Sequence, residues 1–174
     1  MMDPQVPVKA PTSPAWTLSH RGDKRALPLA DRHYNRQKPG SPQFVPPGRC
    51  LVLLADNERA LWVTSWPYAV YVKHAWAGAW INSLFRNKDS GRLSSDLITE
   101  AVAITRGLWE PPDLGIVSFV DAAQIRRKRD PGRCYRRAGF TLVGRTKSAG
   151  LLAFQMCPED MPEPRVLPMP EVTS

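Results

Sequence analysis

The chain has 174 residues, 43% of them hydrophobic and six of them tryptophan, which supports one packed domain. Its length is too short for two domains of ordinary size. The formal net charge is +8 and is unevenly placed. Residues 157–174 contain one arginine against four carboxylates, which leaves −3 there and +11 on residues 1–156. Such a basic body favours a polyanionic partner, nucleic acid first, with an ordinary basic domain as the alternative.

Cysteine and histidine usage argues against a metal site or a disulfide framework. The three cysteines are Cys50, Cys134 and Cys157, an odd and widely spaced set, and the three histidines are equally scattered. This pattern predicts a reducing compartment and no bound metal. The N-terminus shows no signal pattern and no apolar run approaches membrane-spanning length, so we expect a cytoplasmic protein without a membrane partner.

Proline-rich segments flank a central body. Residues 1–15 contain four prolines and residues 157–174 contain five, separated mostly by polar residues. Proline removes backbone donors and such segments bury little apolar area, so we expect two extended or disordered tails, the second of them acidic. A single folded domain is predicted over residues 16–156.

Within the body, residues 49–54 and 60–65 are apolar strand-like runs joined by a polar turn, which predicts a hairpin. A third strand is predicted at residues 76–85. From Ser94, which can serve as N-cap, apolar residues recur at helical spacing until Pro111-Pro112 ends the helix. The later predictions are a strand at 114–121, a short helix at 131–138, and strands at 140–145 and 150–156.

The short helix is marked at both ends. Asp130 is a suitable N-cap and Pro131 suits the first helical position, where a missing N–H costs nothing. Gly139 supplies the left-handed residue that stops the helix. Tyr135, four residues before Gly139, therefore lies on one defined face.

The loop before the long helix places basic and small residues at a helix N-terminus, where free amides and the helix dipole favour phosphate. The alternative is an exposed polar loop with an ordinary cap. The candidate phosphate-binding residues are Arg86, Asn87, Lys88, Gly91, Arg92, Ser94 and Ser95.

A second basic cluster surrounds the short helix, with seven bases around Asp130 in twelve residues. Bases this dense favour a polyphosphate partner, either DNA or CoA, although charge runs are commonly solvated faces. The candidate nucleic-acid-binding residues are Arg126, Arg127, Lys128, Arg129, Arg133, Arg136 and Arg137.

The string Tyr135-Arg-Arg-Ala-Gly-Phe140, followed by strand 141–144, resembles the last conserved segment of the GNAT acyltransferases. The order of predicted elements over residues 50–156 also resembles that fold, which is α+β with a mixed, mostly antiparallel sheet flanked by helices. The resemblance implies acetyl-CoA or a related acyl-CoA as cofactor, with its pyrophosphate at the loop before the long helix. It also implies that Tyr135 lies near the CoA sulfur and protonates the departing thiolate. Gly91 alone matches the glycines of the family's phosphate loop.

The segment Asp31-Arg-His-Tyr-Asn-Arg-Gln-Lys-Pro-Gly40 taken alone is a surface segment. It resembles the His-Tyr-Ser-type motif of the Mom proteins, GNAT-like phage enzymes that modify adenine in DNA, with Asn35 in place of the serine. Later Mom motifs are similar to 83–87 with Ser94-Ser95, and to Val120-Asp121 with Gly132 and Tyr135. The resemblance implies catalytic roles for His33, Tyr34 and Asp121 beside Tyr135, with His33 as a general base near neutral pH.

We therefore expect a GNAT-like acyl-transfer-type enzyme that modifies an exocyclic amine of a DNA base, working in a bacterial or phage-infected host cytoplasm. A duplex base has to be flipped out before its amine is reached. Two alternatives stay open. One is an acetyl-CoA-dependent N-acetyltransferase acting on a small amine or a protein. The other is a catalytically inactive GNAT-like protein that binds nucleic acid.

Overall fold

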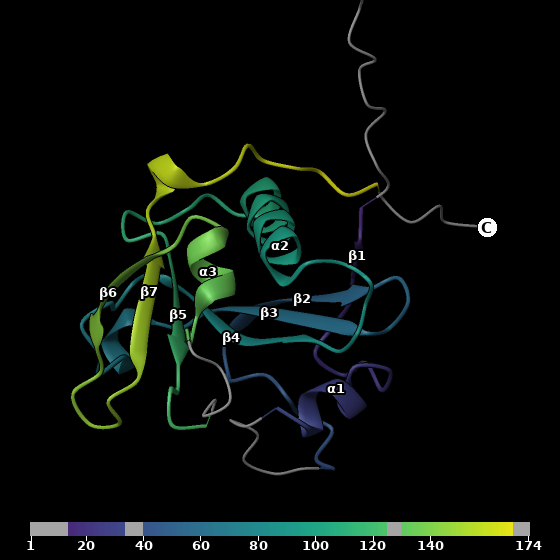
Figure 1. Ribbon diagram of the computed structural model, residues 1–174, viewed down its shortest axis with the longest axis horizontal. Coiled ribbons are helices and arrows are strands. Elements are labelled where there is room, and N and C mark those ends of the chain that lie inside the picture. Colours follow the sequence, from purple (N-terminus) through teal and green to yellow (C-terminus); the bar gives the residue numbers. More distant parts are fainter. Residues whose placement is uncertain (1–13, 34–39, 125–129, 169–174) are drawn as a thin grey trace, which may run out of the picture.

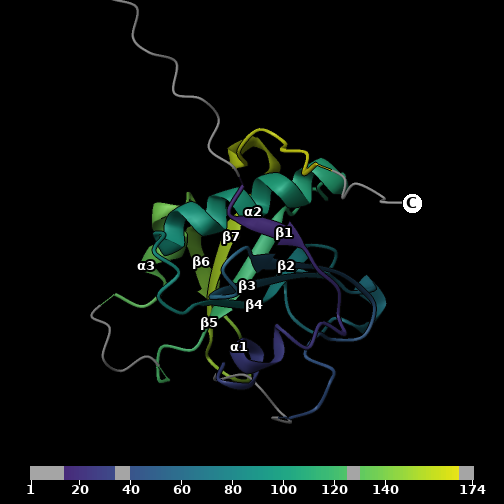
Figure 2. The ribbon, with the colours of Figure 1, turned by 90° about the vertical axis from the view of Figure 1, so that its right-hand side faces the viewer.

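The computed structural model describes residues 14–33, 40–124 and 130–168 (Figure 1). Within these residues, seven strands form one open sheet in the order β1-β2-β3-β4-β5-β7-β6. Helices α2 and α3 cover one face of the sheet and α1 covers the other (Figures 1 and 2). The predicted α+β class, a mostly antiparallel sheet flanked by helices, is confirmed.

Among the strand pairs described, β4 and β5 are parallel and the others are antiparallel. Helix α2 connects β4 to β5, because parallel neighbours need a long crossover. No helix in the described part of the chain is long and apolar enough to cross a membrane. The elements in chain order are β1 (Trp16–Leu18), α1 (Leu27–Asp31), β2 (Arg49–Ala55), β3 (Ala60–Trp66), β4 (Trp80–Asn87), α2 (Ser94–Leu108), β5 (Ile116–Val120), α3 (Arg133–Arg137), β6 (Thr141–Arg145) and β7 (Leu152–Met156).

The predicted hairpin of β2 and β3 is confirmed. Its apolar runs are continuous because both faces of these strands are buried. Leu51 and Leu53 pack into the core under α2, whereas Val52 and Leu54 pack into a second core against α1. The central strands therefore separate two apolar layers.

The third strand was predicted to begin at residue 76, and this start is wrong. Ala79 donates to the carbonyl of Trp76 in a turn, and Gly78 has a φ of +98°, so β4 begins at Trp80. The strand also runs further than predicted, because Arg86 and Asn87 pair with β3. These two residues belong to the strand and not to the loop that follows.

Helix α2 confirms the predicted helix, but Ser94 is its first helical residue and not its cap. Leu93 occupies the cap position with an extended backbone, and no side-chain cap is found among the described residues. The hydroxyl of Ser94 instead accepts a hydrogen bond of 3.1 Å from the Asn87 amide. The first turn of α2 therefore keeps its backbone amides uncapped.

Helix α3 is shorter than predicted, and Asp130 and Pro131 lie outside it. Gly132 is the cap residue, with a left-handed φ of +82°, and a Cβ there would overlap the Phe154 ring. The Asp130 carboxylate pairs with the Arg136 guanidinium instead of capping the helix. Gly139, with a φ of +103°, ends the helix as predicted.

The C-terminal segment packs on α2 and is not a free tail (Figures 1 and 2). After a 3-10 helix at Pro158–Asp160, Met161 is buried in the main core. The backbone amide of Arg165 donates to the Ala103 carbonyl of α2 at 2.9 Å, and a Cβ on Gly107 would overlap the Arg165 carbonyl oxygen. The domain boundary predicted at residue 156 is therefore too early, and residues 1–13 and 169–174 lie outside the described residues.

Glu100 of α2 joins both ends of the described chain to this helix. Its carboxylate accepts a 2.8 Å hydrogen bond from the Ala15 amide and lies 3.5 Å from the Arg165 guanidinium. Trp16 adds an indole hydrogen bond of 2.9 Å to the Leu97 carbonyl. The orientation of α2 is thus held from both termini.

We predict that Met161→Ala lowers the free energy of unfolding by about 2 kcal/mol or more, because it leaves a cavity in the core. Met161 is 7% exposed, whereas Val166 on the same segment is 79% exposed. The matched control Val166→Ala should change stability by less than about 0.5 kcal/mol. Urea unfolding measures both variants, and equal stabilities would show that the segment does not pack on α2.

Candidate functional site

Strands β4 and β5 pair over a short distance and then part. Their pairing covers Trp80–Asn82 against Ile116–Ser118. Beyond this point β4 continues along β3 as far as Asn87, and β5 continues along β7 as far as Val120. The sheet therefore opens between the second halves of the two strands.

Asn82 lies at the point where the strands part. Its carboxamide oxygen accepts from the Tyr135 hydroxyl at 2.7 Å and from the Ser118 hydroxyl at 3.1 Å. Its amide nitrogen donates to the carbonyls of Val63 at 3.0 Å and Leu84 at 2.9 Å. These bonds occupy both acceptor and both donor positions of the side chain and join β3, β4, β5 and α3. The pairing of β3 with β4 shifts register between Val63 and Thr64, next to this network.

A cavity of about 800 Å³ occupies the gap. This volume is in the range of ligand-binding pockets. Its lining comes from β4, the start of α2, β5, α3 and the residues after α1, which are far apart in the sequence. The described lining residues are Arg32, His33, Phe85, Arg86, Asn87, Leu93, Ser94, Ser95, Val120, Asp130, Gly132, Arg133, Cys134, Tyr135 and Arg137.

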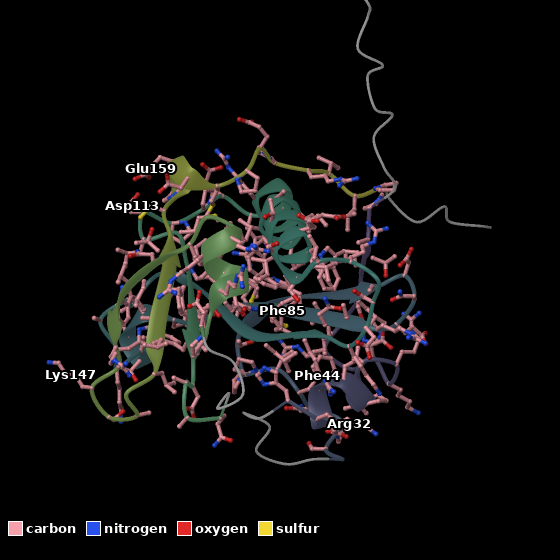
Figure 3. The ribbon with its side chains drawn as sticks, in the orientation of Figure 1. Arg32, Phe44, Phe85, Asp113, Lys147 and Glu159 are labelled. Carbon is pink, nitrogen blue, oxygen red and sulfur yellow. The ribbon has the colours of Figure 1, made fainter. Side chains whose placement is uncertain are left out.

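The cavity lining includes side chains from both faces of the sheet. Phe85 and Asn87 pair with Trp62 and Ala60 of β3, whose side chains face the core under α2. Arg86 pairs with Leu61, which faces α1, and its guanidinium donates to the Leu29 carbonyl of α1 at 3.1 Å. Figure 3 shows Phe85 beside α3 near the centre of the molecule and Arg32 at the lower right beside α1. The cavity therefore crosses the plane of the sheet.

The turn before α1 is fixed by a buried carboxylate. Asp23 accepts from the Ser19 hydroxyl at 2.6 Å and from the Arg25 amide and guanidinium at 2.9 Å. The hydrogen bond from Arg25 holds the pKa of Asp23 well below its usual range. This turn sets the start of the short helix whose other end leads to Arg32 and His33 in the cavity.

The cavity is electropositive. Its described lining includes four arginines and one carboxylate, Asp130, and that carboxylate is paired with Arg136. Burial lowers the pKa of Arg86, and the neighbouring charge of Arg32 lowers it further. The uncapped first turn of α2, with Ser94 and Ser95, adds backbone amides and the positive end of the helix dipole. Such a site favours anionic ligands.

The structure brings together residues from three segments that the sequence singled out separately. The predicted residues that line the cavity are His33, Arg86, Asn87, Ser94, Ser95, Arg133, Tyr135 and Arg137. Those outside its described lining are Lys88, Gly91, Arg92, Asp121 and Arg136. Tyr34 and Arg126, Arg127, Lys128 and Arg129 lie outside the described residues.

Asp121 and Arg136 have local structural contacts. The Asp121 carboxylate accepts from the Ala123 amide at 3.0 Å in the turn after β5. The Arg136 guanidinium lies over the Phe154 ring at 5.5 Å and pairs with Asp130. Arg136 projects from α3 toward β7, whereas Arg133 and Arg137 line the cavity from the same helix. The arginines of α3 are therefore divided between the cavity and the side of the helix that faces β7.

The hydroxyl of Tyr135 is buried in a hydrogen bond within the protein. The resemblance to GNAT acyltransferases implied a hydroxyl beside a leaving thiolate. The side chain is 8% exposed, its ring stacks on Phe154 with centroids 6.0 Å apart, and its hydroxyl donates to Asn82. Tyr135 thus anchors α3 to the point where β4 and β5 part.

Sequence reasoning did not name Asn82, Phe85 or Ser118 as site residues, although Phe85 lies within the segment 83–87 that resembles a Mom motif. Asn82 and Ser118 are polar residues inside apolar strands, and this is a signal that was available. A buried polar side chain in a strand needs hydrogen-bond partners, and here those partners meet where β4 and β5 part. Phe85 carried no comparable signal, because an aromatic residue in a strand is ordinary.

No family model, curated protein or solved structure matches this chain. Among the described residues, no group of three or more His, Cys, Asp or Glu side chains is placed to hold a metal ion. The chemistry of the cavity is therefore inferred from its own residues, which are rich in guanidinium groups and helix amides and include one imidazole.

We predict that Tyr135→Phe lowers the free energy of unfolding by about 1 kcal/mol, because the buried Asn82 oxygen loses its shorter hydrogen bond. Tyr68 is 73% exposed, so Tyr68→Phe is a matched control that should be near neutral. Thermal and urea unfolding of both variants provide the measurement. If both substitutions lower the free energy of unfolding by the same amount, the network at Asn82 contributes nothing to stability.

Proposed function

We propose that this protein is a GNAT-like transferase that takes an acyl-CoA-type donor in the cavity and modifies an exocyclic amine of a DNA base. One observation carries the proposal. The gap between β4 and β5 gathers residues from the predicted phosphate loop, the Tyr135 helix and the His33 segment into a single electropositive cavity. These are the segments on which the resemblance to GNAT acyltransferases and to Mom proteins rests.

The α2 side of the cavity suits the phosphates of the donor. The uncapped first turn of α2 offers backbone amides at Ser94 and Ser95. Arg133 and Arg137 stand one helical turn apart on α3, which places them on the same face. A diphosphate between the first turn of α2 and these two arginines would accept hydrogen bonds from the backbone amides on one side and from the guanidinium groups on the other. The acyl end of the donor then extends toward the gap in the sheet.

The α1 side of the cavity is where an acceptor amine would enter. There the amine nitrogen attacks the thioester carbonyl, a C–N bond forms, and the C–S bond breaks to release the thiolate of CoA. His33 lines this side, and an imidazole exchanges protons near neutral pH, so it takes the proton that the amine loses. The released thiolate takes a proton from water or an acid at the cavity mouth.

A specific observation favours a second candidate, a protein that binds nucleic acid on the same scaffold without turnover. The Tyr135 hydroxyl donates to Asn82, and Asp121 lies outside the described lining of the cavity. Two of the residues expected in catalysis are thus engaged in structural contacts. Turnover with an acyl-CoA separates this candidate from the transferase, because both bind polyanions.

We predict that DNA from cells expressing the protein contains an acylated nucleoside, detected by mass analysis after enzymatic digestion. His33→Gln, expressed at the same level, should strongly reduce that nucleoside, because the amine loses its general base. The mass added to the nucleoside identifies the acyl group. Unmodified DNA, together with no acyl transfer to any amine in vitro, would favour the binding protein.

We predict that Arg133→Gln combined with Arg137→Gln weakens CoA binding by about a hundredfold, from about tenfold for each charge-assisted hydrogen bond lost. The matched control is Arg145→Gln with Lys147→Gln, which removes two charges at β6 and the turn after it, outside the described lining of the cavity. Figure 3 shows Lys147 at the lower left edge of the molecule. Calorimetry measures the CoA affinity of both double variants. Pantetheine, which lacks the phosphates, should bind both with the same affinity. Equal CoA affinities would remove Arg133 and Arg137 from the donor site.

A further inference from the structure

Arg86 has no ion-pair partner among the described residues, whereas Arg25 pairs with Asp23, Arg136 with Asp130 and Arg165 with Glu100. The other arginines that line the cavity are exposed, but Arg86 is half-buried. The guanidinium of Arg86 makes one hydrogen bond within the described residues, to the Leu29 carbonyl. A guanidinium carries five N–H donors, so most of its donors remain available to a ligand.

A second guanidinium lies on the same side of the cavity. Arg86 binds the Leu29 carbonyl of α1, Arg32 follows the last residue of that helix, and both arginines line the cavity, where the charge of Arg32 repels that of Arg86. Arg86 is half-buried and Arg32 is exposed, and an anion bound between the two guanidinium groups would offset their repulsion. An arginine fork matches the planar geometry of a carboxylate or phosphate, and two forks can share one phosphate. The arrangement therefore has the form of an anion subsite.

The subsite is separate from the predicted donor phosphates. The sequence predicted that Arg86 binds these phosphates. In the sheet, however, Arg86 stands opposite Leu61 of β3 and faces α1. The next residue, Asn87, stands opposite Ala60 and faces α2. The amides of α2 and the arginines of α3 lie on the α2 side of the sheet. A donor held there leaves the α1 side to the acceptor.

We propose that Arg32 and Arg86 form a phosphodiester-binding subsite that holds the backbone of a DNA strand on the α1 side of the cavity. The inference rests on the proposed function, because it takes the donor to occupy the α2 side. A phosphate held by both guanidinium groups places the adjoining nucleotide at the mouth of the gap, beside His33. The strand has to be single or locally opened, since its base must leave the stack to enter.

The test measures binding of a fluorescent single-stranded oligonucleotide over a salt series, in parallel with CoA binding. Arg86→Gln and Arg32→Gln should each weaken DNA binding by about tenfold. Their double variant should flatten the log–log salt slope by about 0.7, the value for one phosphate on a single strand. CoA affinity should stay unchanged in all three. Arg145→Gln, which removes a charge on the edge strand β6, should leave both affinities unchanged.

Arg86→Lys keeps the charge but removes the fork, so it should weaken DNA binding while retaining most of the salt slope. It also keeps the proposal testable if Arg86→Gln unfolds, which thermal melting detects. A mononucleotide and inorganic phosphate serve as competitors. Competition by either as strong as by the oligonucleotide would overturn a DNA-strand subsite in favour of a small phosphorylated acceptor.

Failure of the subsite and failure of the proposed function give different results. If the wild type binds DNA and CoA but the Arg32 and Arg86 variants keep full DNA affinity and slope, the subsite is overturned and the proposed function stands. A loss of CoA affinity in these variants would assign both arginines to the donor, which also overturns the subsite. If the wild type binds neither DNA nor CoA, the proposed function fails together with the inference.

Discussion

The site depends on the four hydrogen bonds of Asn82. A parallel pair of strands normally continues until one strand ends, but here β4 and β5 part while each still pairs with its other neighbour. Asn82 binds carbonyls of β3 and β4 and accepts hydroxyls from β5 and α3. A buried amide with all its positions occupied tolerates little displacement, because any movement leaves a polar atom unpaired. The gap that holds the cavity is therefore a fixed feature of the sheet.

The sheet divides the charge of the cavity between two sides. On one side lie the helix amides of α2 and the arginines of α3, and on the other lie Arg32 and Arg86. Strand β4 contributes to both sides, since its neighbouring residues Arg86 and Asn87 point to opposite faces. In the proposed function, these two sides would receive the two phosphorylated substrates of the transfer.

Helix α2 has to keep its first turn at the gap, and both ends of the described chain hold it there. Glu100 binds the Ala15 amide and the Arg165 guanidinium, and the Arg165 backbone binds the Ala103 carbonyl. Gly107 allows this close approach, because a side chain would overlap the Arg165 carbonyl oxygen. The C-terminal segment therefore contributes to the position of the site although none of its described residues lines the cavity.

The sequence by itself determined the α+β class, the β2–β3 hairpin, the length of α2 and the glycine stop after α3. These features depend on local signals: apolar runs, helical spacing, prolines and a left-handed glycine. It also named the segments that meet in the cavity. The tertiary structure decided the rest. Ser94 and Asp130 have cap chemistry, but the Asn87 amide and the Arg136 guanidinium engage them instead. Arg86 lies on the α1 side of the sheet, apart from the α2 amides with which the sequence grouped it, because the face of a strand residue depends on strand pairing, and a shift of one residue reverses it. The Tyr135 hydroxyl is turned inward because Asn82, 53 residues away in the chain, needs a donor that only the packed sheet brings within reach.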